Sequence, residues 1–461
     1  MHIFEIMSVK PQFCSIHRPP QLAVLGISYI DRFNKYFSVN NFKRRILKMN
    51  NNGNCIVGQS GGPTVAINAS LSGVLQAVME NGYYDKVYGM VNGIEGLLQG
   101  KFMDLTAKFN DKEAVAKLAN TPSMYLGSCR YKLPNDENSI AYEELFSFFK
   151  KHDIRTIFYI GGNDSMDTVL KLSGYAKKHG HNINVLGIPK TIDNDLPITD
   201  HTPGFGSAAK FVATSVLEIA HDTYIYNIPS VTIVEIMGRN AGWLTASSIL
   251  ARTEYSPAPD LIYLPEVAFD KDKFIEDVKR IQKVRKNIVI AVSEGIKDKD
   301  GKYISAAGGK IDAFGHQQLC GAGKALESLI SAEIGCKVRS IELNVLQRAA
   351  SHIASKTDLD EAAQISRYAV SLGIEGETGK MICYKRLSNN PYLIDTFAYD
   401  ISAIANEEKR VPLEWITEEG NNLTQEAVDY LFPLIQGETT VSYANGLPSY
   451  CDISHLHGGT L

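Results

Sequence analysis

Short apolar runs alternate with longer stretches of helical periodicity along most of the chain after residue 53. Nearly continuous apolar runs predict buried strands at 54–58, 86–91, 155–160, 184–188, 231–236 and 287–293. Apolar residues at helical spacing predict helices at 66–80, 141–151, 165–179 and 207–221. This alternation is typical of α/β folds, in which right-handed helical crossovers join parallel strands.

The pattern weakens toward the end of the chain. After Arg410 it indicates one helix, at 424–435, and the tail from Tyr443 carries turn residues without periodicity. We find no internal repeat and no low-complexity tract. The chain has 461 residues, of which 44% are hydrophobic and 21% charged. A length of this order allows a large core, for which two domains are the natural expectation.

Charge and cysteine usage narrow the class of protein. The net charge of −4 gives no argument for binding nucleic acid or a membrane surface. No apolar run approaches the roughly 20 residues that a membrane-spanning helix needs. The seven cysteines are scattered and none forms a Cys-x-x-Cys pair, which favours reduced thiols in a cytoplasmic protein.

The first 50 residues differ from the rest. They carry eight Lys or Arg and two Asp or Glu, a local charge of 8 − 2 = +6. They lack the uninterrupted apolar core of a secretory signal, although a basic and acid-poor segment is compatible with organelle targeting. We favour a poorly ordered basic extension over 1–50, with Met49 as an alternative start, and rest no function on it.

Two polar segments carry the clearest chemistry. Gly161–Ser165 and Pro189–Asp195 each follow a predicted buried strand. In open α/β sheets ligands bind at the carboxyl ends of strands, so Asp164, Lys190 and Asp195 should meet in one cleft with Asp193. Glycines let the backbone approach an anion, carboxylates hold a metal or accept a proton, and lysine neutralises charge. Together these residues suit phosphoryl transfer.

The two segments also carry a family resemblance. The chain resembles the phosphofructokinases, in particular the pyrophosphate-dependent branch. Further matching segments follow in the family's order, at Gly58–Ala69, Tyr125–Arg130, Val234–Arg239, Ser293–Gly295 and Leu346–Arg348. A single Gly-Gly-x-x-Ser turn would be weak evidence, because NAD kinases and lipid kinases use a similar one, but the ordered set is specific.

The resemblance implies two interleaved, Rossmann-like α/β domains with parallel sheets, the phosphofructokinase fold. The phosphoryl-donor domain would comprise 51–204 plus a later segment. The sugar-phosphate domain would comprise 205–346 plus C-terminal segments, and 411–461 would form a C-terminal extension. The active site would lie between the two domains.

The donor side would begin with Ser60, Gly61 and Gly62. This turn is predicted to open the helix at 66–80, where backbone N–H groups and the helix dipole favour an anion. By resemblance, Gly62 contacts the phosphoryl donor. Arg130 would bridge the donor and acceptor phosphates, a task that suits the planar, two-point binding of a guanidinium.

Two residues of the donor side predict which donor is used. ATP-using relatives have glycine at the positions of Asp164 and Lys190. A carboxylate at Asp164 fills the space of an α-phosphate and repels it. Lys190 can reach a short donor such as pyrophosphate and neutralise charge on the leaving group.

The resemblance also assigns the base and the metal. Asp193 would accept the proton of the attacking sugar hydroxyl. Mg²⁺ would be held near Asn163, Asp164 and Asp195. Most members of the family have aspartate where this chain has Asn163, so we expect weaker metal affinity or a shifted metal position.

The acceptor side would be built from both domains. By resemblance the sugar phosphate contacts Thr191, Ile192, Met237, Gly238, Arg239, Glu294, Arg339 and Arg348. One of the last two would reach across a subunit boundary, which predicts a homodimer or a higher oligomer. Ser230 and Val345 stand where many members have arginine and histidine, so the sequence defines the acceptor sugar less well than the phosphoryl donor. A related ketose phosphate such as sedoheptulose 7-phosphate is an alternative acceptor.

The resulting expectation is a reversible transfer of phosphate from pyrophosphate to the 1-hydroxyl of fructose 6-phosphate, with Mg²⁺ as cofactor. Two alternatives stay open: an ATP-dependent phosphofructokinase, and a catalytically silent family member that regulates or senses. Ser72 and Gln76 stand where bacterial ATP-using relatives have effector-binding arginines, so we expect weak or absent nucleotide regulation.

Overall fold

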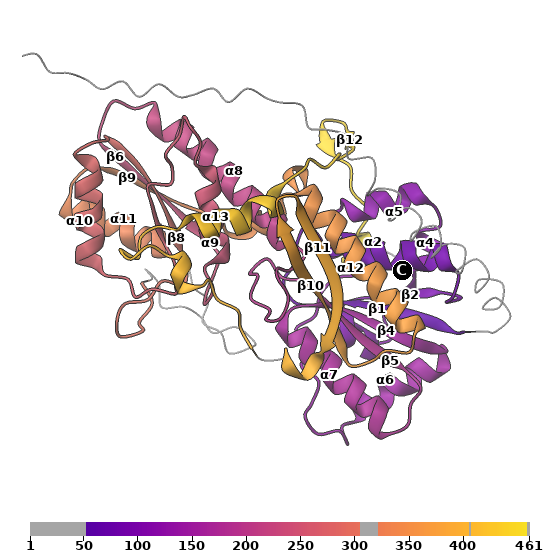
Figure 1. Ribbon diagram of the computed structural model, residues 1–461. Coiled ribbons are helices and arrows are strands. Elements are labelled where there is room, and N and C mark those ends of the chain that lie inside the picture. The colour runs from indigo at the N-terminus through magenta and orange to yellow at the C-terminus, as the bar shows by residue number, and fades with distance from the viewer. Residues whose placement is uncertain (1–51, 305–320, 405–406, 459–461) are drawn as a thin grey trace, which may run out of the picture. The chain divides into compact units, whose positions relative to one another are not determined.

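The computed structural model describes residues 52–304, 321–404 and 407–458. The basic segment 1–50, with Met49, lies outside these residues. Within the described ranges the strands form a seven-stranded, a four-stranded and a two-stranded sheet (Figure 1). None of the helices in these ranges is long and apolar enough to cross a membrane.

The larger sheet has the order β11-β10-β5-β4-β1-β2-β3. Its strands are β1 (Asn54–Gln59), β2 (Val87–Met90), β3 (Phe102–Asp104), β4 (Ile154–Gly161), β5 (Asn184–Pro189), β10 (Lys380–Asn389) and β11 (Tyr392–Asp400). The pairs in its centre are parallel, as predicted. The strands at both edges are antiparallel to their neighbours, so the sheet is mixed rather than wholly parallel.

Side chains of the larger sheet alternate between two apolar layers, because successive residues of a strand point to opposite faces. In β1, Cys55 and Val57 pack with one layer of helices, whereas Ile56 packs with the other. The first layer contains α2 (Ile67–Asn81), α4 (Leu105–Lys108), α5 (Lys112–Ala119) and α12 (Lys356–Ile374). The second contains α3 (Gly93–Leu98), α6 (Ile140–Lys151) and α7 (Asn163–Lys178). Burial on both faces explains the continuous apolar runs of β1, β4 and β5.

The smaller sheet is parallel throughout, in the order β7-β8-β6-β9. Its strands are β6 (Ser230–Ile236), β7 (Leu261–Tyr263), β8 (Asn287–Ser293) and β9 (Lys337–Glu342). One face packs against α8 (Phe205–Tyr224), α9 (Trp243–Ser247) and α13 (Gln425–Leu431). The other packs against α10 (Lys271–Gln282) and α11 (Ala322–Glu333). The α/β class predicted from the sequence is therefore confirmed.

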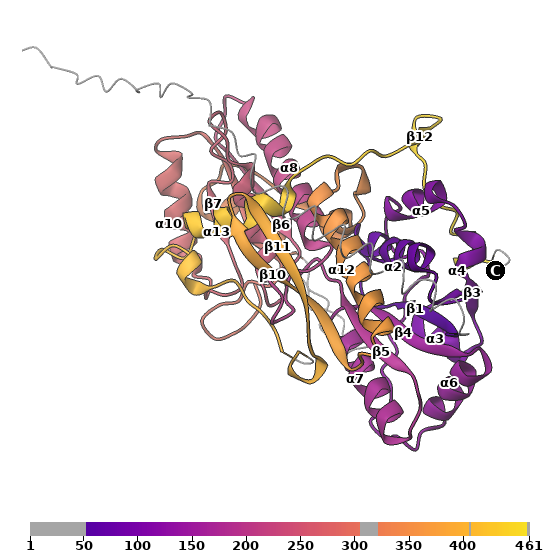
Figure 2. The ribbon, with the colours of Figure 1, turned by 45° about the vertical axis from the view of Figure 1, so that its right-hand side comes forward.

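The chain returns from the smaller sheet to the larger one late in the sequence. After β9, helix α12 lies beside α2, and the long hairpin β10–β11 joins the larger sheet next to β5 (Figure 2). Helix α13 then returns to the core of the smaller sheet. This crossing is of the interleaved kind that we expected. The domain boundaries near residue 204 and the C-terminal extension from residue 411 stay predictions.

Several predicted bounds shift, and one shift changes the argument about the site. Helix α2 begins at Ile67, so the glycine turn at Gly61 is not in its first turn, and the prediction that this turn opens the helix is wrong. Helix α7 begins at Asn163 instead of Ser165. The helix expected at 424–435 is α13 followed by a 3₁₀ turn, and β12 (Tyr443–Ala444) pairs with β13 (Leu447–Pro448) in the tail. Five cysteines lie in the described residues, and all are free thiols.

Candidate active site

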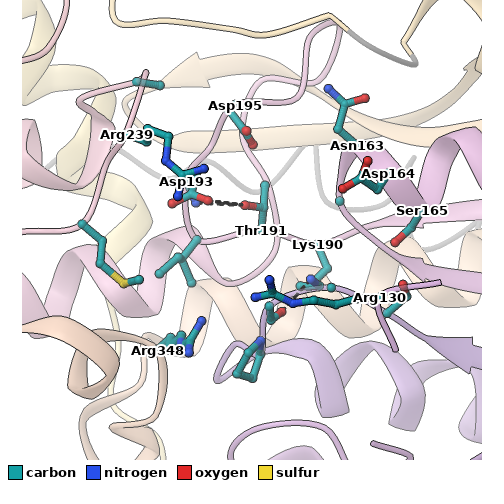
Figure 3. A pocket seen from close by; sticks show the side chains of 18 of the residues that line it. Arg130, Asn163, Asp164, Ser165, Lys190, Thr191, Asp193, Asp195, Arg239 and Arg348 are labelled. Carbon is teal, nitrogen blue, oxygen red and sulfur yellow. Dashed lines mark hydrogen bonds between the residues drawn. The ribbon is translucent and has the colours of Figure 1, made fainter. Parts of the chain in front are cut away.

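A cavity of about 470 Å³ opens where strands of both main sheets end. Loops that follow β1, β4 and β5 contribute to its wall, and so do loops that follow β6 and β8 (Figure 3). Most of the residues singled out from the sequence line it: Ser60, Gly61, Gly62, Arg130, Asn163, Asp164, Lys190, Thr191, Ile192, Asp193, Asp195, Met237, Arg239, Glu294 and Arg348. Segments far apart in the sequence thus meet in one site, because the carboxyl ends of parallel strands share an edge.

Lys190 lies under the glycine turn. Its side chain is 2% exposed, and its Nζ donates to the carbonyl oxygen of Gly62 at 2.6 Å. Gly61 has a φ of +84°, which favours glycine, and a Cβ there would lie 3.2 Å from the same Nζ. Burial lowers the pKa of Lys190 to about 8, so the group is still mostly protonated at pH 7. The lysine supplies a positive charge below the turn.

The first turn of α7 forms the neighbouring wall. Gly162 is the N-cap, and the helix then begins with Asn163 and Asp164. The helix N-terminus at this cavity is therefore that of α7, not that of α2. The Asp164 carboxylate is about half exposed and pairs with Lys132 at 3.1 Å. The Nδ2 of Asn163 donates to the backbone carbonyl of Glu407 at 2.8 Å, which ties α7 to a distant part of the chain.

Two carboxylates stand on the loop that follows β5. The backbone N–H of Asp193 donates to the Thr191 hydroxyl at 3.1 Å, and that hydroxyl donates to the Asp193 carboxylate at 3.3 Å. Burial raises the pKa of Asp193 above its ordinary value. Burial, and then the neighbouring Asp193, raise the pKa of Asp195 to about 7. A buried carboxylate with a raised pKa is a better proton acceptor than an exposed one.

The opposite wall comes from the smaller sheet. Glu294 follows β8, and burial raises its pKa to about 7. Its carboxylate accepts from the backbone N–H of Gly238 at 3.3 Å. Arg239 lines the cavity near Asp193 (Figure 3), and its Nε is buried without a hydrogen-bond partner among the described residues. Such a donor is suited to an anion that fills the cavity.

Arg348 lies at the glycine turn in the same chain. A Cβ on Gly62 would lie 3.5 Å from its Nη1. Together with Arg130 and Lys190 it makes the cavity rich in cations on the side of the turn. Clustered cations at a glycine turn suit a ligand with several phosphate oxygens.

Four residues from the sequence argument lie outside the lining of the cavity. Arg339, on β9, pairs instead with Asp222 at 3.0 Å near the surface. The N–H of Gly238 donates to Glu294 at 3.3 Å, and its carbonyl oxygen accepts from the Ser293 hydroxyl. Ser230 is buried at the start of β6, where its hydroxyl accepts from Asn287 at 2.8 Å. Val345 is 49% exposed.

The cavity also contains residues that the sequence did not suggest. Glu408 lines it, as do Tyr131 and Asn240. Tyr131 and Asn240 adjoin recognised motifs, so proximity in sequence is a usable signal for them. Glu408 belongs to a charged run, Glu407–Arg410, that resembles an ordinary solvent-exposed loop, and no sequence pattern links it to the site.

The described residues contain no cluster of three or more His, Cys, Asp or Glu side chains that would hold a metal by themselves. The cavity does present carboxylates, from Asp164, Asp195 and Glu408, and the amide of Asn163. Mg²⁺ usually binds through one or two carboxylates, its own waters and substrate phosphates. The oxygen donors present fit that mode, and they do not fit a cage made of protein alone.

Comparison with known proteins agrees with this arrangement. Residues 54–372 match the profile of the family described as Phosphofructokinase. The chain is 42% identical to the pyrophosphate–fructose 6-phosphate 1-phosphotransferase of Halomonas elongata, over 87% of this chain and 96% of that protein. It is 41% identical to the protein of the same name from Xanthomonas campestris, over 88% and 97%.

A solved structure agrees as well. The pyrophosphate-dependent phosphofructokinase of Nitrosospira multiformis superposes with a TM-score of 0.78 at 38% identity, covering 87% of this chain and 96% of that one. The chain belongs to the phosphofructokinase family.

Proposed function

We propose that this protein transfers a phosphoryl group from pyrophosphate to the 1-hydroxyl of fructose 6-phosphate, giving fructose 1,6-bisphosphate and phosphate. The observation that carries the proposal is the pair Asp164 and Lys190 at one cavity, one in the first turn of α7 and the other buried under the glycine turn. Relatives that are 40–42% identical carry the same activity in their names.

On the donor side, the proposal rests on size and charge. Asp164 occupies a position where ATP-using members of the family have glycine, and its carboxylate would repel an α-phosphate. Lys190, mostly protonated at pH 7, would neutralise charge that develops on the leaving phosphate. Arg130 would hold oxygens of the donor and of the transferred group, and Arg348 would bind the 6-phosphate of the acceptor. The turn at Ser60, Gly61 and Gly62 would bind the donor through backbone N–H groups.

On the acceptor side, Asp193 would act as the base. The O–H bond of the sugar 1-hydroxyl breaks and its proton passes to Asp193. A new O–P bond forms to one phosphorus of pyrophosphate, and the bridging P–O bond breaks to release phosphate. The raised pKa of Asp193 suits it to hold that proton until the product leaves.

Contacts to the sugar would come from both walls. Glu294 would bind sugar hydroxyls, with Met237 and the Gly238 backbone beside them, and Thr191 and Ile192 would line the same space. Arg239, whose Nε lacks a partner, would bind an anionic group of the acceptor or of the transition state.

We include Mg²⁺ in the proposal. When bound, the ion would neutralise charge on the phosphates, and Asp164, Asp195 and the Asn163 amide are the groups that would hold it, with Glu408 close by. Loss of one negative charge at Asn163 relative to most of the family leads us to expect a metal affinity below that of an aspartate-containing relative.

The proposal extends to assembly and location. Arg339 lies outside this chain's own cavity, which supports a role in the site of a neighbouring subunit and hence a homodimer or higher oligomer. Five free cysteines among the described residues support a reducing compartment such as the cytoplasm.

The test measures turnover of fructose 6-phosphate in the presence of Mg²⁺, with pyrophosphate and with ATP in parallel assays. Release of phosphate reports on the first reaction, and formation of ADP reports on the second. The proposal expects fructose 1,6-bisphosphate with pyrophosphate and little or none with ATP. Product with ATP alone would favour the ATP-dependent alternative. Binding of fructose 6-phosphate without turnover would favour the silent family member, and turnover of sedoheptulose 7-phosphate in its place would change the acceptor.

A further inference from the structure

The charged run Glu407–Arg410 crosses the site described above. Lys409 is 215 residues from Asn194 in the sequence, yet the two side chains are hydrogen-bonded. The run contacts α7 through the Glu407 carbonyl, which accepts from Asn163. It contacts the smaller sheet's side through the Lys409 carbonyl, which accepts from the indole N–H of Trp243 at 3.0 Å. One short segment therefore contacts α7, the loop that follows β5, and α9.

Lys409 makes most of this segment's contacts to the loop Thr191–Asp200, which follows β5. Its Nζ donates to the Asn194 side-chain oxygen at 3.2 Å, to the Thr199 carbonyl at 3.1 Å and to the Asp200 carbonyl at 2.7 Å. These three acceptors use all three N–H donors of an ammonium group. The backbone N–H of Lys409 donates to the carbonyl of Asp195 at 2.7 Å. Its Nζ also lies 5.3 Å from the ring centroid of Trp243.

The loop has a particular need for such support. Asn194, between the two carboxylates, has a φ of +54°, in the left-handed region that few residues besides glycine adopt and in which asparagine is one of the more frequent exceptions. The side-chain Nδ2 of Asn194 donates to the Tyr430 hydroxyl at 2.9 Å, and that hydroxyl donates to the backbone carbonyl of Asp200 at 2.6 Å. The flanking side chains of Asp193 and Asp195 both line the cavity. Without the contacts to Lys409 and Tyr430, the loop would lose the groups that hold this conformation.

We propose that Lys409 is a positioning residue of the phosphoryl transfer: its ammonium group and backbone N–H hold the loop Thr191–Asp200 so that Asp193 faces the acceptor hydroxyl. Lys409 does not line the cavity, so it acts through the loop and does not touch the substrate. Small displacements of a base from its reacting geometry cost large factors in rate. The inference rests on the proposed function for the identity of the reaction, but the contacts of the loop do not depend on it.

The experiment compares Lys409→Met with a matched control, Lys210→Met. Lys210 on α8 also donates from its Nζ to backbone carbonyls, at 2.7 Å for Gly437, and pairs with Glu438 at 3.0 Å, but it lies outside the lining of the cavity. Both variants lose an ammonium donor to the backbone. We expect kcat with pyrophosphate to fall at least tenfold in Lys409→Met, with smaller changes in KM, and to stay within twofold of the wild type in Lys210→Met.

Hydrogen–deuterium exchange supplies a readout that does not need activity. Amides of residues 191–200 should exchange faster in Lys409→Met than in the wild type, and at the wild-type rate in Lys210→Met. Tyr430→Phe, a milder change to the same contacts, should act in the same direction and be non-additive with Lys409→Met. It keeps the test decisive if Lys409→Met does not fold.

The outcomes separate the two proposals. Faster exchange of the loop in a protein whose wild type shows no turnover would overturn the proposed function and leave the support of the loop by Lys409 intact. Unchanged exchange, or a loss of kcat in Lys210→Met as large as in Lys409→Met, would overturn the positioning role.

Discussion

The Nζ of Lys190 donates to the carbonyl oxygen of Gly62 at 2.6 Å, which joins the loop after β5 to the turn after β1. The lysine is buried, and Asp193 and Asp195 lie close enough to act on its charge. A single cation thus stands between the glycine turn, where the donor would bind, and the carboxylates, where the acceptor would lose its proton. The pH dependence of the enzyme should report on this arrangement.

Activity should fall on the alkaline side as Lys190 loses its proton. Burial lowers its pKa to about 8, so the charged form predominates at pH 7 and is lost as the pH rises through 8. We expect kcat/KM for pyrophosphate to decline with a midpoint near that value. In Lys190→Arg the decline should be shallower, because arginine stays protonated, but it should not vanish, because burial also lowers the pKa of Lys409 to about 8. A wild-type profile that is flat from pH 7 to 9 would contradict the prediction, and Lys210→Arg should keep the wild-type profile.

Replacement of the proposed base should abolish most turnover and spare binding. In Asp193→Asn the side chain keeps its size and loses its proton acceptor, so kcat should fall by about 10²–10⁴-fold. Titration calorimetry should still detect binding of fructose 6-phosphate to Asp193→Asn. Asp167→Asn is the control, because Asp167 pairs with Lys171 on α7 outside the lining of the cavity. A kcat within tenfold of the wild type would assign the base elsewhere.

Stability should depend on pH through His201. The ring bonds Asp200 at 2.8 Å and Glu361 at 2.7 Å, and although burial alone would lower its pKa, these carboxylates raise it from 6.5 to about 9. Because the folded pKa exceeds the unfolded one, the stabilisation is complete below pH 6.5 and is lost as the pH rises through 9. This shift in the pKa of His201 corresponds to a stabilisation of the folded state of on the order of 3 kcal/mol.

Urea denaturation at pH 6.5 and pH 9 measures this effect. The urea concentration at the midpoint of unfolding should be lower at pH 9 than at pH 6.5 for the wild type. The decrease should be much smaller in His201→Asn. His221 is exposed, and His221→Asn should behave as the wild type does. Equal falls in His201→Asn and the wild type would mean that another group carries the dependence.

Nucleotide effectors should have little effect. Ser72 is buried in α2, and its hydroxyl accepts from the Gln76 amide at 3.1 Å, so neither side chain offers a positive charge to a phosphate. Initial rates at subsaturating fructose 6-phosphate should stay within about twofold when ADP or phosphoenolpyruvate is added. A change of sigmoidality or of apparent KM with either compound would refute this expectation.

The sequence predicted the longer strands that are buried on both faces, and it missed the half-exposed hairpin β10–β11. Strand β8 has the bounds that its apolar run indicated, 287–293. The outer half of β10 and most of β11 alternate between partly buried and exposed residues, so the hairpin gave no continuous apolar run. The predicted start of α2, at 66, is one residue from the observed Ile67, but Gly61 and Gly62 were wrongly taken as the turn into this helix, because a loop through Ala66 separates them from it.

The same contrast holds for the site. Lys190 and Asp164 were predictable because each directly follows a buried strand or begins the next helix, and such positions share one edge of the sheet. Lys409 was not, since its role comes from a tertiary contact across 215 residues and its neighbours in the sequence are charged. Arg339 shows a further limit: its place on β9 is given by the sheet, but a role in a second subunit lies beyond a single chain.

The most direct test of the account is the donor preference of Asp164→Gly combined with Lys190→Gly. The ratio of kcat/KM for pyrophosphate to that for ATP would be measured in this double variant and in the wild type, at saturating fructose 6-phosphate and Mg²⁺. If a carboxylate and a buried cation select the short donor, the ratio should strongly favour pyrophosphate in the wild type and should drop by at least a hundredfold in the variant, with measurable use of ATP. A wild type that prefers ATP, or a ratio that both proteins share, would contradict the account.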